Sequence, residues 1–191
     1  NGAECEPYLT VDDMLMRTFP ADIIEGTLIA MKVLGVAGAV IGVEGNKKEA
    51  IAALKKSLAA VPGRGTIRIK KLATKYPQGA EKQMIYSLLG RRVPSGGLPM
   101  DAGVIVQNVG TLFALRKAVL YNKPLLARYV TISGNAIRKP GNYKVRIGTR
   151  IADIVEECGG LTEEPSRIVM GGPLCGVSVH SLDFPVVKGT S

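Results

Sequence analysis

Residues 39–72 read AVIGVEGNKKEAIAALKKSLAAVPGRGTIRIKKL, and this stretch decides the fold class. It opens on a short apolar run, which is typical of a buried strand. Asn46 and Glu49 then have the spacing of a capping box and predict a helix from Asn46 onward. Residues 62–65 predict a turn, and residues 66–72 alternate isoleucine with basic side chains, as in a half-buried strand. Strand, helix and strand in this order indicate an α/β domain with a largely parallel sheet.

The flanking segments continue the alternation. Residues 21–34 carry apolar side chains at helical spacing between a proline and a glycine, and residues 79–89 predict a helix that ends at a glycine. Residues 91–103 form a long loop rich in proline and glycine, a kind of loop that is often functional. Residues 104–106 predict a strand, and the apolar spacing at 112–119 predicts a further helix.

The pattern changes near residue 125. Residues 129–133 and 143–147 predict two strands around a Pro-Gly-Asn turn. Residues 151–158 predict a short helix that ends at two glycines, and residues 168–170 predict a third strand. These elements indicate a compact α+β unit of about 55 residues after the α/β domain.

The composition is that of a globular protein. Of the 191 residues, 46% are hydrophobic and 21% are charged, which excludes a disordered chain. No apolar run reaches the roughly 18 residues that span a bilayer, and no secretion leader is visible. The net charge is +9, with an acidic stretch at 1–25 and a basic stretch at 32–92. The basic stretch is open to several interpretations: nucleic acid, an acidic membrane surface, an acidic protein, a phosphorylated cofactor or plain solvation.

Cysteine and histidine usage argues against a metal site. The three cysteines (Cys5, Cys158 and Cys175) are scattered, no C-x-x-C motif occurs, and His180 is the one histidine. We therefore expect neither a cysteine-ligated zinc nor an iron–sulfur cluster in this chain. Free thiols fit a reducing, cytoplasmic setting.

The opening segment places an amide and two carboxylates close together. Asn1, Glu4 and Glu6 lie within six residues. An asparagine amide can bond the edge of a heterocycle, and a carboxylate can accept from ribose hydroxyls. A chance polar loop would have the same composition. The glycines at 95–99 would let a ligand approach the backbone, or would simply form an irregular connection.

Two further segments carry candidate binding groups. Tyr76 offers an aromatic ring, Gly79 stands at an expected helix start, and Glu81 lies in the first turn, where it also favours the helix without any function. The sequence QNVGT at 107–111 follows a predicted strand and opens a predicted helix. Ligands of open α/β sheets bind at this end of the strands, and helix amides there favour phosphate. Asparagine and threonine also cap helices.

Five motifs stand out when they are taken together. They are NGAECEPYLT at 1–10 with Asp12 and Asp13 following it, KYPQGAEKQMIYSLLGRRVPSGGLPMDAG at 75–103, VQNVGT at 106–111, MGGPLCG at 170–176 and FPVVKGTS at 184–191. With these motifs the sequence resembles the RnfC subunits of Rnf electron-transport complexes and, more distantly, the NADH-binding flavoprotein subunit of respiratory complex I. Cobalamin-reductase subunits and electron-transfer proteins of amino-acid fermentation carry nearly the same motifs.

The resemblance implies a fold, cofactors and site residues. It implies a Rossmann-like FMN- and NADH-binding α/β domain at 1–125, a β-grasp domain of the SLBB type at 126–180, and a linker at 181–191. It also implies hydride transfer from NADH to FMN, followed by single electrons to iron–sulfur centres. The flavin site would be lined by Asn1, Glu4, Tyr76, Gly79, Gln107, Asn108 and Thr111. The nicotinamide nucleotide would be faced by Glu6 and Glu81.

The sequence departs from the family pattern in three places. The family's glycine-rich phosphate loop precedes the segment equivalent to Asn1, and its cysteine-rich 4Fe–4S segment follows the segment equivalent to Ser191; neither is in this sequence. Ala80 stands where the complex I subunit has a second acid. We therefore expect this fragment to bind FMN weakly or not at all, and to be inactive alone. The parent subunit would be an NADH-dependent oxidoreductase, held at the inner face of the cell membrane by partner subunits.

Two alternatives remain open from the residues. The chain could be a module that docks a protein or a ligand such as cobalamin through 126–180, without its own flavin. The charge alone suggests a nucleic-acid binder, but the few aromatic residues do not interleave with the basic cluster, so we expect no nucleic-acid partner. Neither the electron acceptor nor the oligomeric state follows from the sequence.

Overall fold

The computed structural model describes residues 1–62 and 66–190, and the chain divides into two compact units. Unit 1 comprises Asn1–Cys5 and Asp12–Pro124, and unit 2 comprises Glu6–Val11 and Leu125–Ser191. The short segment Glu6–Val11, which we call the strap, thus belongs to unit 2 although both its neighbours belong to unit 1. The predicted α/β domain at 1–125 included residues 6–11 and so did not separate the strap from unit 1.

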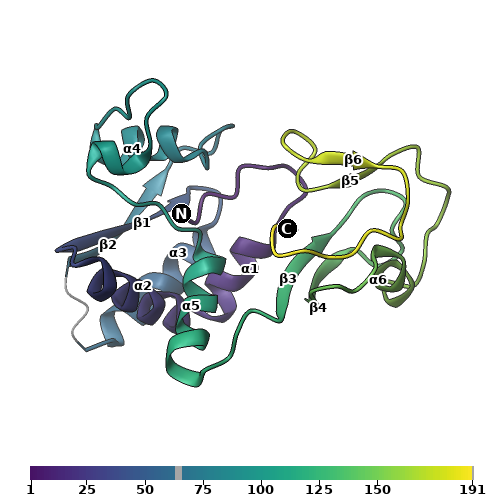
Figure 1. Cartoon of the computed structure of the whole chain (residues 1–191), viewed down its shortest axis with the longest axis horizontal. Coiled ribbons are helices and arrows are strands. Elements are labelled where there is room, and N and C mark those ends of the chain that lie inside the picture. The colour runs from purple at the N-terminus through teal and green to yellow at the C-terminus, as the bar shows by residue number, and fades with distance from the viewer. Residues whose placement is uncertain (63–65, 191) are drawn as a thin grey trace. The chain divides into compact units, whose positions relative to one another are not determined.

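Unit 1 has helices on both faces of a small parallel sheet (Figure 1). Strand β1 pairs with β2 in parallel, with Gly38 opposite Thr66, and Gly2 forms a parallel bridge to Val43. The elements are α1 (Val11–Thr18, counted from the end of the strap), α2 (Pro20–Leu34), β1 (Gly38–Glu44), α3 (Lys48–Ala60), β2 (Thr66–Leu72), α4 (Glu81–Leu89), the 3-10 turn η1 (Pro99–Ala102) and α5 (Val109–Tyr121).

Proline and glycine set the ends of α2 as predicted, and a further glycine sets its packing. Helix α2 begins at Pro20 and ends at Gly35, whose φ of 63° lies in the left-handed region that glycine tolerates. Gly26 allows α2 to approach α5 closely, because a Cβ there would overlap the carbonyl of Leu112. Arg116 of α5 extends this contact through ion pairs to two acids of α2.

Two local predictions are wrong. Asn46 does not cap α3: the helix begins at Lys48, and the Asn46 amide donates to the Thr74 hydroxyl instead. Residues 104–106 form no strand, because no strand of the described residues runs beside them to complete a hydrogen-bond ladder. Helix α1 was not predicted. The turn predicted at 62–65 falls largely on residues 63–65, which lie outside the described residues.

Unit 2 is a small α+β unit built of two hairpins and one helix. Its elements are β3 (Ala127–Ile132), β4 (Gly141–Arg146), α6 (Ile151–Glu157), β5 (Ile168–Met170) and β6 (Val177–Val179). Both strand pairs are antiparallel. The core contains Val130, Val145, Ile154, Cys158 and Val186.

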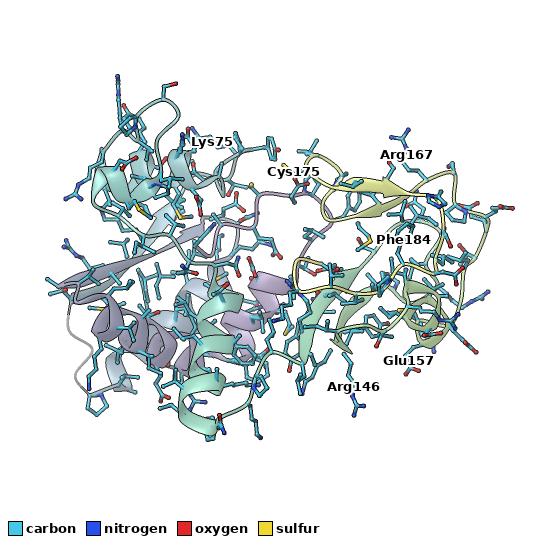
Figure 2. All side chains as sticks on the ribbon, viewed as in Figure 1. Lys75, Arg146, Glu157, Arg167, Cys175 and Phe184 are labelled. Carbon is cyan, nitrogen blue, oxygen red and sulfur yellow. The ribbon has the colours of Figure 1, made fainter. Side chains whose placement is uncertain are left out.

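The segment predicted as a linker at 181–191 contributes to this core. Val186 is 1% exposed, and its backbone bonds Gly148 and Thr149 in both directions. The amide of Ile151 donates to Phe184, which is labelled in Figure 2. Residues 182–186 therefore pack as part of unit 2, since their backbone groups find partners there.

Candidate functional site

Asn1 joins three segments at the carboxyl end of β1. Its backbone nitrogen donates to the Gln107 carbonyl at 2.7 Å, and its carbonyl accepts from the Val109 amide at 2.9 Å. Its side-chain Nδ2 donates to the Gly79 carbonyl at 3.0 Å, while Oδ1 accepts from the Ala3 amide at 3.1 Å. The structure thus brings together residues that are 78 and 106 positions apart in the sequence.

Gly79 is required by this close approach. A Cβ at position 79 would overlap the Ala3 carbonyl and press on the Cys5 sulfur. The neighbouring Gln78 is 1% exposed and donates from Nε2 to the Ser87 hydroxyl at 3.1 Å, which fixes the 75–80 loop to α4. The loop is therefore held from both sides.

Asn108 caps α5 and reaches a second helix. Its Oδ1 accepts from the Gly110 amide at 2.7 Å, and its Nδ2 donates to Asp12 Oδ2 at 2.7 Å. The capping interpretation of the QNVGT motif is correct for Asn108, and it coexists with a position beside the Asn1 cluster. Thr111 lies exposed in the first turn of the same helix.

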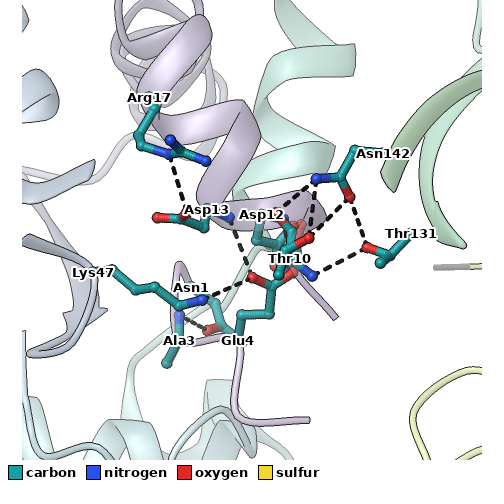
Figure 3. Close-up of polar contacts among 11 residues, drawn as sticks. Asn1, Ala3, Glu4, Thr10, Asp12, Asp13, Arg17, Lys47, Thr131 and Asn142 are labelled. Carbon is teal, nitrogen blue, oxygen red and sulfur yellow. Dashed lines mark hydrogen bonds and ion pairs between the residues drawn. The ribbon is translucent and has the colours of Figure 1, made fainter. Parts of the chain in front are cut away.

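Glu4 caps helix α1 from outside the helix (Figure 3). Oε1 accepts from the Asp12 amide at 2.9 Å and Oε2 from the Asp13 amide at 3.3 Å, with Lys47 Nζ 3.6 Å away. The Glu4 side chain is 4% exposed. Burial, followed by the charge of Asp12, raises the pKa of Glu4 above its usual value. Both oxygens of Glu4 are thus engaged by the protein itself.

The remaining predicted residues lie apart from this network. Tyr76 is 45% exposed on the 75–80 loop, and Glu81 is exposed at the first residue of α4. Glu6 belongs to the strap in unit 2, where its Oε2 accepts from the Leu174 amide at 3.1 Å. Its Oε1 is buried and has no hydrogen-bond partner within the described residues.

Three residues of the network were not among the predicted site residues. Asp12 links Asn108 to α1, Lys47 neutralises Glu4, and Gln78 anchors the 75–80 loop. Paired acids in a first helical turn are a sequence signal that could have revealed α1 and the role of Asp12. No local pattern distinguishes Lys47 from the other lysines of the basic stretch.

An apolar groove of about 530 Å³ runs from this cluster along unit 1. Asn1 and Gln107 lie among its lining residues, together with residues 36–41, Ile85 and residues 103–106. Residues 38–41 of β1 have no strand partner on this side within the described part of the chain. A free strand edge of this kind is where another extended segment pairs. The groove is therefore explained by strand pairing, and we assign the candidate site to the polar cluster.

Residues 1–62 and 66–190 show neither a metal-binding cluster nor a membrane-crossing helix. No three histidine, cysteine, aspartate or glutamate side chains are grouped there so that they could hold a metal ion. No helix in these ranges has the length and apolar character that crossing a membrane requires.

Comparison with known proteins gives the chain a family. The model of the Nuo51 FMN-binding domain matches residues 1–117, and that of the SLBB domain matches residues 129–178. The chain is 50% identical to one subunit of the proton-translocating ferredoxin:NAD(+) oxidoreductase complex of Clostridium ljungdahlii. It is 47% identical to the corresponding subunit of the Na(+)-translocating ferredoxin:NAD(+) oxidoreductase complex of Acetobacterium woodii. These alignments cover all of the chain but only 41% and 42% of the relatives' lengths.

A solved structure supports the fold. An NAD+-reducing NiFe-hydrogenase in its H2-reduced state matches 100% of this chain and 38% of its own chain, with a TM-score of 0.82 at 22% identity. The predicted fold class, a Rossmann-like α/β domain followed by an SLBB-type domain, is thereby confirmed. The resemblance to RnfC subunits is confirmed as well. The chain belongs to the family of the Nuo51 FMN-binding domain, and an SLBB domain follows that domain in the sequence.

Proposed function

We propose that this chain is the flavin-binding part of an electron-transport subunit that takes hydride from NADH onto FMN and passes single electrons to iron–sulfur centres. The observation that carries the proposal is the cluster around Asn1, which gathers Gly79, Gln107 and Asn108 at the carboxyl end of β1. Ligands of α/β sheets bind at this end. The family match over residues 1–117 supports FMN as the flavin.

The residues present fit the ring portion of FMN. The edge of the isoalloxazine ring offers hydrogen-bond donors and acceptors, and the side chains of Asn1, Gln107 and Asn108 can supply both. Tyr76 has an exposed ring and lies in the segment that contains Gly79. Thr111 is exposed and lies in the segment that contains Gln107. When bound, FMN supplies the redox chemistry that these side chains lack.

The protein's own side chains would bind and orient the flavin and the nucleotide. Asn1 and Asn108 are already fixed by their protein partners, so little ordering would be needed on binding. Glu81 is exposed and could accept from a nucleotide hydroxyl. Glu4 would act by capping α1, and the charge of Lys47 would favour the ionised form of Glu4.

The relatives suggest the wider setting. Both are named as subunits of ion-translocating oxidoreductase complexes. We propose that the present chain likewise works with partner subunits at the inner face of the cell membrane, with 4Fe–4S clusters outside residues 1–191. The basic stretch 32–92 would then face an acidic redox protein or the nucleotide.

The test is FMN titration followed by anaerobic addition of NADH. It uses the chain alone and the chain preceded by the residues that come before the matched segment in the Clostridium ljungdahlii relative. We expect stoichiometric FMN on the longer version and bleaching of its absorbance by NADH. A longer version that stays colourless contradicts the flavin assignment. Flavin that binds without bleaching contradicts NADH as the donor and directs attention to Ala80.

A tyrosine pair supplies the matched control. Tyr76 and Tyr86 are 45% and 50% exposed, and both lie near or on α4. Tyr76→Ala should weaken FMN affinity about tenfold, the scale of one stacked aromatic. Tyr86→Ala should leave it unchanged, and equal losses would remove Tyr76 from the site.

A second candidate function rests on unit 2 alone. A groove of about 490 Å³ there is lined by Val130, Ile132, Ile154, Met170 and Leu182, among others. This groove favours the docking of a ligand or protein without a flavin. If FMN fails to bind, retention of a partner by the chain with its strap in place would support this alternative.

A further inference from the structure

The strap connects two parts of the candidate site. Cys5 precedes it directly, and α1 follows it from Val11. On the unit 1 side, Glu4 accepts from the amides of Asp12 and Asp13, so the two ends of the strap are bonded to each other. Asp12 is in turn bonded to Asn108. The strap is therefore a closed loop whose neck carries site residues.

Neutral hydrogen bonds hold the far end of the strap in unit 2 (Figure 3). The Thr10 amide donates to Thr131 Oγ1 at 3.1 Å, and that hydroxyl donates to Asn142 Oδ1 at 2.9 Å. Asn142 Nδ2 donates back to Thr10 Oγ1 at 3.0 Å. Thr131 and Asn142 face each other in the β3–β4 register, so the sheet itself sets their spacing.

Two more contacts fix the strap. The Ser133 hydroxyl donates to the Tyr8 carbonyl at 3.1 Å. Tyr8 has a φ of 65°, although it is not glycine and its side chain is 70% exposed. Such a backbone persists only where its surroundings determine it. Glu6 bonds Leu174, and its carboxylate fills the space that a Cβ at Gly172 would need.

We propose that Thr131 and Asn142 are positioning residues for the flavin site, which they influence through Thr10 and the strap. The inference rests on the proposed function, because the site is taken to bind FMN. Neither residue lies in the segment that matches the FMN-binding domain. By ordering the strap before a ligand arrives, they remove an entropic cost that binding would otherwise carry.

The decisive variant is Thr131→Val. Valine keeps the β-branched shape that a strand favours and removes the hydroxyl that accepts from Thr10. We expect FMN affinity of the extended chain to fall about five- to tenfold, as for the loss of one hydrogen bond. Thr131→Ser restores the hydroxyl and should restore affinity. Thr162→Val is the matched control, because it removes a hydroxyl bond to the Asn135 carbonyl elsewhere in unit 2.

Amide hydrogen exchange gives a readout that needs no flavin. The amides of Ala3 and Asp12 bond Asn1 Oδ1 and Glu4 Oε1, so their protection reports the order of the site. Thr131→Val should speed exchange at both, and Thr162→Val at neither. If no version binds FMN, the proposed function fails while exchange still decides the positioning role. If Thr131→Val matches Thr162→Val in exchange and in affinity, the inference is overturned.

Discussion

The neck and the far end of the strap are built from different chemistry. At the neck, Glu4 is a buried carboxylate that caps α1 beside Lys47. At the far end, Thr10, Thr131 and Asn142 form a neutral network on a sheet. A buried charge that loses its partner is costly, whereas a neutral hydrogen bond contributes modestly. The stability of the neck should therefore depend on charge and pH. The stability of the contact between the strap and the β3–β4 sheet should depend on the fit of neutral side chains.

The largest difference should come from two glycines. Gly79→Ala pushes a methyl group into the Ala3 backbone, which cannot move without breaking the Asn1 cluster. In Gly172→Ala the nearest atoms to the new methyl group belong to the flexible Glu6 side chain, which can move at the cost of its bond to the Leu174 amide. We expect losses in unfolding free energy of about 3 and about 1 kcal/mol, respectively. Denaturant unfolding measures both, and a Gly172 variant as damaged as the Gly79 variant would refute the contrast.

Removing one polar group from each region should give the next largest effect. Glu4→Ala leaves two amides of α1 uncapped and Lys47 without its partner, at a cost of about 2 kcal/mol. Thr10→Val removes the hydroxyl from the far end of the strap, at a cost of about 1 kcal/mol. Thermal unfolding of the two variants under the same buffer conditions makes the comparison. The idea of a charged neck is abandoned if Glu4→Ala proves the milder change.

Ion pairs of the two units should also differ. Arg116 is 16% exposed and bonds Glu25, Asp22 and the Tyr121 hydroxyl, so Arg116→Ala should cost about 1 kcal/mol. Arg150 of unit 2 pairs with Asp153 and Asp183 in solvent, and Arg150→Ala should leave stability unchanged. Raising the salt concentration provides the control. Because Arg116 is mostly buried, salt should screen its ion pairs weakly, and the loss of stability caused by Arg116→Ala should stay nearly the same. An equal effect of the two substitutions would count against this distinction.

The smallest effect should be a difference in pH dependence. Burial raises the pKa of Glu44 above its usual value of 4.5, so the folded protein binds this proton more tightly than the unfolded chain does. The resulting stabilisation is complete below pH 4.5 and is lost as pH rises through the folded pKa. Glu44→Gln should therefore reduce the loss of unfolding free energy between pH 4.5 and neutrality. Thr131→Val should keep the wild-type slope, and identical slopes for all three proteins would contradict the prediction.

Sequence patterns predicted the elements whose signals are local. Strand β2 was predicted at its observed bounds, because alternation along 66–72 reflects one buried face. Helix α2 was predicted within one residue, since Pro20 and Gly35 define its ends. The strand predicted at 104–106 failed because an apolar run says nothing about a neighbouring strand.

For the site, the sequence by itself determined which residue types are present and where helices begin near them. Asn108 was recognisable as a cap because its partner lies two residues away. Only the tertiary structure decided that Asn1 joins Gly79 to Gln107, that the Glu4 carboxylate caps α1, and that the strap belongs to unit 2. Local hydrogen bonds join residues a few positions apart, so the spacing of residue types in the sequence indicates them. Contacts across a hundred residues depend on how whole elements pack, and no spacing records them.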